Sequence, residues 1–181
     1  MRRVSVVGSS GSGKSTVGRE LARLLDVPFV ELDAVHHLEG WTPIDPGEFV
    51  RQLDEITRRP GWVIDGNYRT VVAHGPVWER ADTVVWLDVS RPVASWRVTR
   101  RTLARAASRR VLWNGNRERW ANVFSRDPER SMIRWVWTTH GSVREGYERL
   151  LADPMFAHLD VVRLRRPAEV ARWIDGVSRP G

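Results

Sequence analysis

A glycine- and serine-rich stretch near the N-terminus has the residue types and the spacing that hold a chain of phosphates. The stretch from Gly8 to Ser15 reads GSSGSGKS and matches the P-loop pattern G-x-x-x-x-G-K-[ST]. Glycines let the backbone curl so that N–H groups point at phosphate oxygens, and a following helix offers its N-terminus to the anion. Lys14 would reach the β- and γ-phosphates, and the Ser15 hydroxyl would ligate Mg²⁺. The residues predicted to bind ATP here are Gly8, Ser9, Gly11, Ser12, Gly13, Lys14, Ser15 and Thr16.

The residues around this stretch favour the same interpretation. A β-branched run, 4–7, precedes it, and Val17, Leu21 and Leu24 follow it at helical spacing. A strand, a loop and a helix in that order are the context that the motif requires. Lys14 is also the only lysine in the chain, since all the other basic residues apart from histidine are arginines. The one compact ammonium therefore stands where a phosphate-binding charge is needed.

Length and composition limit the class of protein. The 181 residues suit a single domain, 1–181, and the absence of cysteine excludes disulfides and thiolate metal sites. The start of the chain is unlike a signal peptide, and no apolar run reaches membrane-spanning length, so we expect a cytoplasmic protein without a membrane partner, as a monomer or a homodimer. The net charge is +7, and residues 91–134 alone carry +9. This basic segment predicts a polyanionic partner, either substrate phosphates or nucleic acid, although a solvated helix face is the alternative.

Short apolar runs alternate with longer helical patterns along the chain. This alternation predicts an α/β fold, the three-layer sandwich of P-loop NTPases with a five-stranded parallel sheet. The expected strands are 4–7, 28–33, 62–65, 83–89 and 159–164. We expect Asp45 to cap a helix that begins at Pro46, with Glu48 as its capping-box partner.

The second half of the chain is predicted to be mainly helical. A long arginine-rich helix follows Ser90, with Val93, Trp96 and Leu103 toward the core. A short arginine-rich lid is expected at about 105–130. The next helix begins near Pro128 and carries a core-facing stripe, in which His140 is interpreted as a packed residue and not a catalytic one. The stripe consists of Ile133, Val136, Trp137, His140, Val143, Tyr147 and Leu150.

Carboxylates follow three of the expected strands. Because ligands bind at the carboxyl ends of strands in open α/β sheets, these side chains are candidates for chemistry. Asp65 is predicted to support Mg²⁺ together with Ser15, although it could also cap the next turn; Asp88 is the competing candidate. Asp33 ends the second strand, and the adjacent histidines at 36–37 are assigned to a loop or an acceptor pocket.

By these features the chain resembles the adenylate-kinase-type family of P-loop nucleotide kinases. The run 63–69, VIDGNYR, is similar to the family's apolar-Asp-Gly-Phe-Pro-Arg run, so the resemblance implies that Asp65 supports Mg²⁺ and Arg69 holds the acceptor phosphate. Arg97 and Arg101 stand where the family has arginines that enter its lid. Arg166 begins a run similar to the family's Lys-Pro-x-x-x-Val run, which implies a place beside the nucleotide. Phe-Pro is replaced here by Asn-Tyr, and this leaves the acceptor open.

A closer resemblance is to a bacterial group known as topology-modulation (FlaR-like) proteins or adenylate-kinase-like ATPases. The residues that carry it are 32–33, 40–41, 64–68 and 112–116, which read LD, GW, IDGNY and LWNGN. The name of that group implies a link to DNA topology.

The function predicted from the sequence is ATP- and Mg²⁺-dependent phosphoryl transfer to a small acceptor, either a nucleotide or another small molecule. The predicted catalytic residues are Lys14, Asp33, Asp65, Arg97 and Arg101, with Arg105 or Arg117 as further lid arginines. The predicted acceptor-binding residues are Asp33, Trp41, Asn67 and Arg69. If the acceptor is a hydroxyl, Asp33 is the general base, a layout that resembles shikimate and gluconate kinases. If it is a nucleoside monophosphate, Arg69 matters more.

Two alternatives remain at this point. One is a P-loop ATPase that acts on DNA or on a protein partner, and the other is a nucleotide-binding regulator. A nucleic-acid partner is possible but is not favoured. The arrangement of the arginines separates these classes, because lid arginines converge on the P-loop whereas a nucleic-acid site exposes them as a stripe. A GTPase is not favoured, since guanine recognition by an Asn-Lys-x-Asp run needs a lysine besides Lys14.

Overall fold

The structure is a computed structural model that describes residues 1–108, 111–116, 127 and 131–177. Five parallel strands form one sheet in the order β2-β3-β1-β4-β5. This confirms the predicted five-stranded parallel sheet. The strands are β1 (Arg3–Val7), β2 (Phe29–Glu31), β3 (Trp62–Asp65), β4 (Thr83–Leu87) and β5 (Asp160–Leu164).

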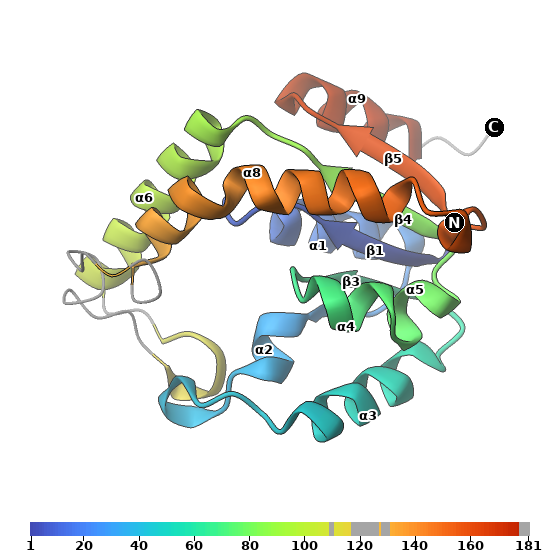
Figure 1. The fold of residues 1–181 in the computed structure, drawn as a ribbon, viewed down its shortest axis with the longest axis horizontal. Coiled ribbons are helices and arrows are strands. Elements are labelled where there is room, and N and C mark those ends of the chain that lie inside the picture. Colours follow the sequence, from blue (N-terminus) through green and yellow to red (C-terminus); the bar gives the residue numbers. More distant parts are fainter. Residues whose placement is uncertain (109–110, 117–126, 128–130, 178–181) are drawn as a thin grey trace.

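Helices cover both faces of the sheet, and two of them extend beyond it (Figure 1). The longest two, α6 and α8, lie side by side and carry the chain away from the sheet. The α-helices are α1 (Lys14–Leu25), α2 (Leu32–His36), α3 (Pro46–Thr57), α4 (Arg69–Ala73), α5 (Pro76–Arg80), α6 (Arg91–Ser108), α8 (Met132–Leu151) and α9 (Pro167–Val177). Three short 3₁₀ turns are η1 (Glu39–Trp41), η2 (Trp113–Gly115) and η3 (Pro154–Phe156).

The two faces of the sheet bury different sets of side chains, because neighbouring residues on a strand point to opposite faces. In β3, Val63 packs with α1 and α9, whereas Trp62 and Ile64 pack with α3, α4, α5 and α8. In β4, Val85 lies in the cluster with α1 and α9, and Trp86 lies in the cluster with α3, α4, α5 and α8. The result is helices, sheet and helices in three layers, and this confirms the predicted sandwich.

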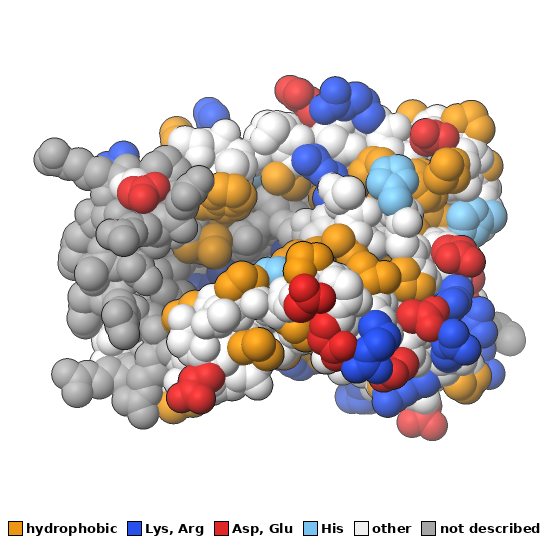
Figure 2. Space-filling view, turned by 60° about the horizontal axis from the view of Figure 1, so that its bottom comes forward, with side chains coloured by type: hydrophobic (Ala, Val, Ile, Leu, Met, Phe, Trp, Pro, Cys, Tyr) orange, Lys and Arg blue, Asp and Glu red, His pale blue; other side chains and the backbone are white. Residues whose placement is uncertain are grey.

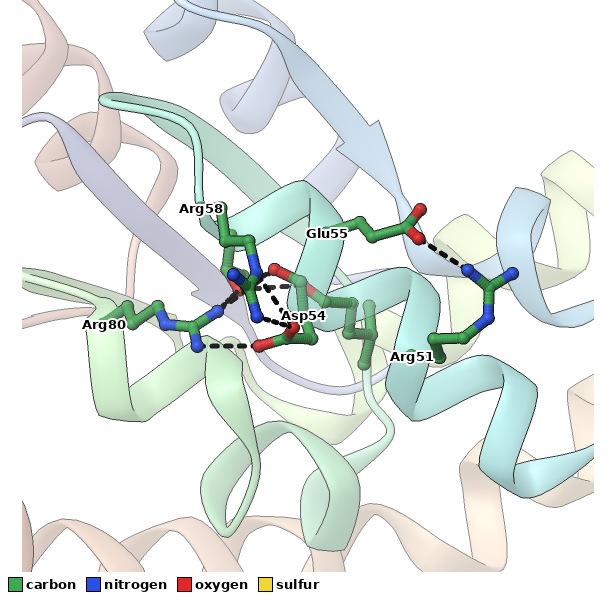
Figure 3. A network of polar contacts seen from close by, with 7 residues as sticks. Arg51, Asp54, Glu55, Arg58 and Arg80 are labelled. Carbon is green, nitrogen blue, oxygen red and sulfur yellow. Dashed lines mark hydrogen bonds and ion pairs between the residues drawn. The ribbon is translucent and has the colours of Figure 1, made fainter.

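Helix α3 begins as the sequence predicts and is fastened to its neighbour by charge. Asp45 Oδ1 accepts a hydrogen bond from the Glu48 N–H at 3.0 Å, with Pro46 in the first turn. Near the other end of α3, Asp54 binds Arg58 and also Arg80 of α5, each at 2.7 Å (Figure 3). The pair with Arg80 links α3 to α5 on the side of the sheet away from the P-loop helix, whereas the pair with Arg58 lies at the C-terminal end of α3.

The predicted core faces of α6 and α8 need correction. Val93, Trp96 and Leu103 are 37%, 68% and 39% exposed, so they do not face the core. The buried face of α6 instead carries small or slim side chains, namely Ala94, Val98, Thr102 and Ala106. Helix α6 approaches α8 and the P-loop closely, and only small residues leave room for this approach. The large apolar side chains, which were predicted to face the core, therefore lie on other faces of the helix.

In α8 the predicted stripe is confirmed at its centre and wrong at one position. Val136, His140 and Tyr147 are buried, and the His140 ring nitrogen Nε2 lies 2.9 Å from the carbonyl oxygen of Val89. Trp137, in contrast, is 52% exposed, and the Arg91 guanidinium stacks over its ring at 4.4 Å. His140 is therefore a packed residue, as expected.

Several element boundaries differ from the predicted ones, and β4, for example, ends at Leu87 and not at residue 89. Strand β2 ends at Glu31, and Asp33 lies in the first turn of α2, so the second strand is shorter than predicted. Residues 105–108 belong to α6, and much of the predicted lid at 105–130, including Arg117, lies outside the described residues. Within the part of the chain that the structure describes, no helix combines the length and the apolar character needed to span a bilayer.

Candidate active site

The P-loop wraps over the N-terminus of α1 in a backbone conformation that its glycines permit. Gly11 and Gly13 have φ angles of 82° and 102°, in the left-handed region that other residues rarely adopt. A Cβ on Gly11 would lie 2.4 Å from the carbonyl oxygen of Ala94, and a Cβ on Gly8 would lie 2.5 Å from that of Leu87. The loop is therefore pressed against α6 and the end of β4, with no room for side chains at these positions.

The P-loop buries polar groups that a ligand could bind. The hydroxyls of Ser9 and Ser12 are buried and have no hydrogen-bond partner among the described residues. Lys14 Nζ donates to the Ser9 carbonyl oxygen at 3.2 Å. Burial lowers the pKa of Lys14, and the negative charges of Asp65 and Asp33 partly oppose that shift. Buried hydroxyls without partners beside a buried ammonium fit phosphate oxygens, so this cradle suits a nucleotide.

Asp65 and Ser15 form the pair that could hold a divalent cation. The Ser15 hydroxyl donates to Asp65 Oδ2 at 2.6 Å. Burial raises the pKa of Asp65, while the charge of Lys14 and the hydrogen bond from Ser15 act in the opposite direction. A hydroxyl and a carboxylate are hard oxygen donors of the kind that Mg²⁺ prefers, so the pair fits that ion.

Asp88, the competing candidate for the metal, is engaged elsewhere. Its Oδ2 lies 2.7 Å from Arg163 Nη2, and Arg144 and Arg165 each approach the carboxylate to 3.5 Å. A carboxylate surrounded by three guanidinium groups is already neutralised by charge pairs. Asp88 therefore ties β4 to β5 and α8, and the geometry favours Asp65 for the metal.

Helix α6 directs arginines at the P-loop. Arg97 Nη1 donates to the Ser12 carbonyl oxygen at 3.2 Å, and Arg101 is close enough for its charge to lower the pKa of Lys14. One turn further on, the Arg105 guanidinium lies 5.7 Å from the centre of the Trp113 ring. Arg97 and Arg101 therefore lie beside the P-loop, as expected for lid arginines and not for an exposed nucleic-acid stripe, whereas Arg105 faces the Trp113 ring.

Asp33 lies close enough to Lys14 for its charge to act on that lysine. Its negative charge raises the pKa of Lys14 and of Asp65, so the three charges share one site. Its Oδ1 accepts a hydrogen bond from the Tyr68 hydroxyl at 3.0 Å. Tyr68 follows β3, next to the expected acceptor residue Asn67, but the sequence analysis gave it no role. The hydrogen bond from Tyr68 to Asp33 becomes visible only in the structure.

Residues 112–116, which we call the latch, fasten the chain after α6 to the segment after β2. Asn116 Oδ1 accepts from the Trp41 N–H at 2.8 Å, and Asn116 Nδ2 donates to the Leu38 carbonyl oxygen at 2.9 Å. Asn114 Nδ2 donates to the His37 carbonyl oxygen at 2.5 Å, and Trp113 Nε1 to Glu31 Oε2 at 2.7 Å. From the sequence these asparagines indicate only a turn, since nothing local reveals their distant partners.

Three predicted site residues contact other elements. Arg69 Nη1 donates to the Ser142 carbonyl oxygen at 3.1 Å and packs on the bare backbone of Gly146 in α8. Asn67 Oδ1 accepts from the Tyr147 hydroxyl at 3.2 Å. Arg166 is exposed before α9, where its N–H donates to Glu169 Oε2 at 3.2 Å. The contacts of Asn67 and Arg69 anchor α8, so their predicted acceptor-binding roles stay predictions.

The surface is hollowed on the side shown in Figure 2, where basic and histidine side chains lie deep and hydrophobic side chains line part of the rim. His36 and His37 both belong to the acceptor side, packed against Tyr68 and Trp41 respectively. Among the described residues no three His, Asp or Glu side chains are grouped to hold a metal ion. Through their ring contacts, the two histidines form part of an aromatic wall on the acceptor side.

Part of the chain is similar in sequence to shikimate kinases. A family model described as shikimate kinase matches residues 10–55, which include most of the P-loop, α1, β2, α2 and most of α3. A shikimate kinase of Sulfurihydrogenibium sp. is 33% identical over 103 residues, which cover 50% of this chain and 62% of that protein. A shikimate kinase of Parabacteroides distasonis is 50% identical over 40 residues, 22% of each chain. The chain thus spans less than two thirds of the length of these curated relatives.

Solved structures resemble the whole fold. A shikimate kinase from Acinetobacter baumannii in complex with shikimate covers 98% of this chain with a TM-score of 0.54 and 21% identity, over 90% of its own length. A gluconokinase from Sinorhizobium meliloti covers 97% with a TM-score of 0.50 and 21% identity, over 95% of its own length. At this identity the likeness establishes the fold alone.

Proposed function

We propose that this protein is a small-molecule kinase that transfers the γ-phosphoryl group of ATP to a hydroxyl of a small acceptor, with Asp33 as the general base. The observation that carries the proposal is that Asp65, bound to Ser15 at 2.6 Å, and Asp33 both lie close enough to the P-loop lysine, Lys14, for their charges to act on it. The likeness of residues 10–55 to shikimate kinases supports the same class of reaction.

In this mechanism the P-loop binds and orients the nucleotide. Lys14 and the loop amides hold the β- and γ-phosphates, and the free hydroxyls of Ser9 and Ser12 are available to their oxygens. Ser15 and Asp65 would hold Mg²⁺, which neutralises phosphate charge when bound. Arg97 and Arg101 stabilise the charge on the transferring group from the α6 side. Positioning and electrostatics then supply most of the rate enhancement.

Asp33 accepts the proton that the acceptor hydroxyl loses. The acceptor oxygen forms a bond to the γ-phosphorus as the bond from phosphorus to the β–γ bridging oxygen breaks, which leaves ADP. The proton of the acceptor hydroxyl passes to the Asp33 carboxylate. A hydroxyl acceptor needs such a base, whereas a nucleoside monophosphate needs a cation for its phosphate instead. Arg69, the cation expected for that second role, donates to the Ser142 carbonyl oxygen, so the hydroxyl acceptor is favoured.

We also propose that the chain belongs near the topology-modulation group of small P-loop proteins. Three of the segments that carry this resemblance contain Asp33, Trp41 and Tyr68, and the fourth is the latch. The four segments meet around the acceptor side, which supports a role for them in an acceptor pocket. A link to DNA is the less favoured alternative, because Arg97 of α6 contacts the P-loop and Arg105 lies over Trp113 of the latch.

The test measures ADP release from ATP and Mg²⁺ with a panel of hydroxy acids including shikimate and gluconate, sugars, nucleosides and nucleoside monophosphates. Stimulation by one hydroxyl acceptor, with the phosphorylated product identified by mass spectrometry, is the expected result. Asp33→Asn should lower kcat for that acceptor about 10²- to 10⁴-fold, with ATP binding unchanged. Stimulation only by a nucleoside monophosphate, or only by DNA, would exclude the proposed reaction.

A further inference from the structure

We infer that Tyr68 and His37 are positioning residues for Asp33, in a hydrogen-bonded chain that runs from His37 through Tyr68 to the carboxylate. This inference rests on the proposed function, in which Asp33 is the base. The Tyr68 hydroxyl lies 3.0 Å from Asp33 Oδ1 and 3.5 Å from His37 Nε2. Residues 33 and 37 lie one helical turn apart on α2 and at its end, so Tyr68 bridges two positions of one short helix.

The direction of the chain follows from the donors available. An ionised carboxylate only accepts hydrogen bonds, so the single Tyr68 proton is donated to Asp33. The oxygen of Tyr68 then accepts from His37, which requires the proton of the imidazole to be on Nε2. His37 Nδ1 is buried and has no partner among the described residues, and this agrees with a bare lone pair there. One tautomer therefore satisfies the whole chain.

The ring of Tyr68 is held in place independently of its hydroxyl. It packs against His36 at 4.5 Å and against Phe49 of α3 at 5.2 Å between ring centres. Burial raises the pKa of Tyr68, and the charge of Asp33 adds to this shift, so the hydroxyl keeps its proton at neutral pH. Tyr68 is thus a fixed neutral donor, and its hydroxyl can be removed without removing the ring.

The other end of the chain is fixed by the latch. The His37 carbonyl oxygen accepts from Asn114 Nδ2, and the His37 ring meets the Trp41 ring edge-on at 5.4 Å. Asp33 is therefore oriented by residues that the segment after α6 holds in place. With Oδ1 bound to Tyr68, the chain presents Oδ2 as the oxygen that takes the proton of the acceptor hydroxyl. The positioning chain therefore determines which oxygen of the carboxylate acts as the base.

The principal test is a double-mutant cycle between Tyr68 and Asp33. Tyr68→Phe keeps the ring and should lower kcat about 10-fold for the acceptor found above, because a hydrogen bond to a charged group is lost. The KM for ATP should stay within about twofold of the original value, since the P-loop is untouched. In an Asp33→Asn background the same change should have no further effect on kcat. A purely structural role for Tyr68 would lower kcat in both backgrounds alike.

His37 supplies the matched pair of variants. Gln places a side-chain amide donor near the position of Nε2, whereas Leu has no donor. We expect His37→Leu to lower kcat about three- to fivefold and His37→Gln to restore most of it. Equal losses in the two variants would remove His37 from the chain.

The outcomes separate this inference from the proposed function. If Asp33→Asn leaves kcat unchanged, Asp33 is not the base, and the proposed function fails in that respect. If Asp33→Asn lowers kcat but Tyr68→Phe does not, or if the two losses simply add, the positioning chain is overturned while the base assignment stands. Unfolding in urea, which should give similar midpoints for the Phe variant and the original protein, excludes a folding defect as the cause.

Discussion

The nucleotide side and the acceptor side of the site are built in different ways. The nucleotide side is one continuous segment, 8–16, wrapped over the start of α1 and closed by arginines of α6. The acceptor side is assembled from β2, α2, η1, Tyr68 and the latch, which are joined by side-chain hydrogen bonds across as many as 82 positions of sequence. Local backbone geometry thus specifies the phosphate cradle, whereas long-range polar contacts specify the acceptor pocket.

The largest effect should come from the nucleotide side, at Lys14. Lys14→Ala removes the one ammonium in the cradle, so we expect turnover to fall about 10³-fold or more. The side chain makes one hydrogen bond, to the Ser9 carbonyl oxygen, so the fold should survive. ADP release measures the first effect and circular dichroism the second. Retained turnover in a folded Lys14→Ala protein would contradict the assignment of the cradle.

Two glycines provide a matched comparison between the two sides. Gly11 and Gly115 have nearly the same φ, 82° and 80°, but a Cβ at Gly11 would lie 2.4 Å from a backbone oxygen, whereas a Cβ at Gly115 meets nothing within 4 Å. Gly115→Ala should therefore cost about 1 kcal/mol of unfolding free energy for the backbone conformation alone. Gly11→Ala should cost about 3 kcal/mol or more, because the loop must also move away from α6. Urea unfolding measures both.

Equal costs for the two glycine variants would show that the P-loop is not pressed against α6 as described. ATP affinity gives a second readout, since only the Gly11 variant should lose it. The Gly115 variant serves as the control for the effect of φ.

The next effect should appear at the metal pair. Asp65→Asn removes the carboxylate beside Ser15, so we expect the Mg²⁺ concentration needed for half-maximal activity to rise about tenfold. An unchanged requirement would move the metal to Asp88 or Glu31. Because Arg163 already neutralises Asp88, a parallel Asp88→Asn variant should leave the requirement unchanged while lowering stability.

The Asp65→Asn variant also tests how the free energy of unfolding depends on pH. Burial raises the pKa of Asp65 above its ordinary 3.8, so the folded protein binds this proton more tightly than the unfolded chain does. This contribution to stability is fully present below pH 3.8 and is lost as the pH rises through the raised value. Asp65→Asn should therefore lose less unfolding free energy than the original protein between pH 3.8 and neutrality. Identical pH slopes in urea unfolding would contradict the raised pKa.

The smallest effect should come from the latch. Asn116→Ala removes bonds to the Trp41 N–H and the Leu38 carbonyl oxygen, so we expect about 1–2 kcal/mol of destabilisation and a several-fold higher KM for the acceptor. The KM for ATP should stay unchanged. Asn116→Asp keeps an oxygen for the Trp41 N–H and should lose less. A rise in the KM for ATP alone would contradict the division of the site into a nucleotide side and an acceptor side.

Sequence reasoning was most successful where neighbours in the chain decide the structure. The order of strands and helices, the cap at Asp45 and the glycine loop all follow from local patterns. It was wrong where packing between helices decides which residues are buried. Trp96 and Trp137 stand at apolar positions but are exposed, because α6 approaches its partners through Ala94 and Val98. Side-chain size favoured the wrong face there.

The sequence by itself determined the phosphate cradle, because a P-loop needs only a short run of glycines, a lysine and a hydroxyl in fixed order. The tertiary structure alone decided what faces that cradle. It brought Asp33 and Tyr68 within hydrogen-bonding distance, paired Asp65 instead of Asp88 with Ser15, and turned Arg69 onto α8. The physical reason is that hydrogen bonds and charge pairs act over a few ångströms of space, whereas sequence patterns report only neighbours along the chain.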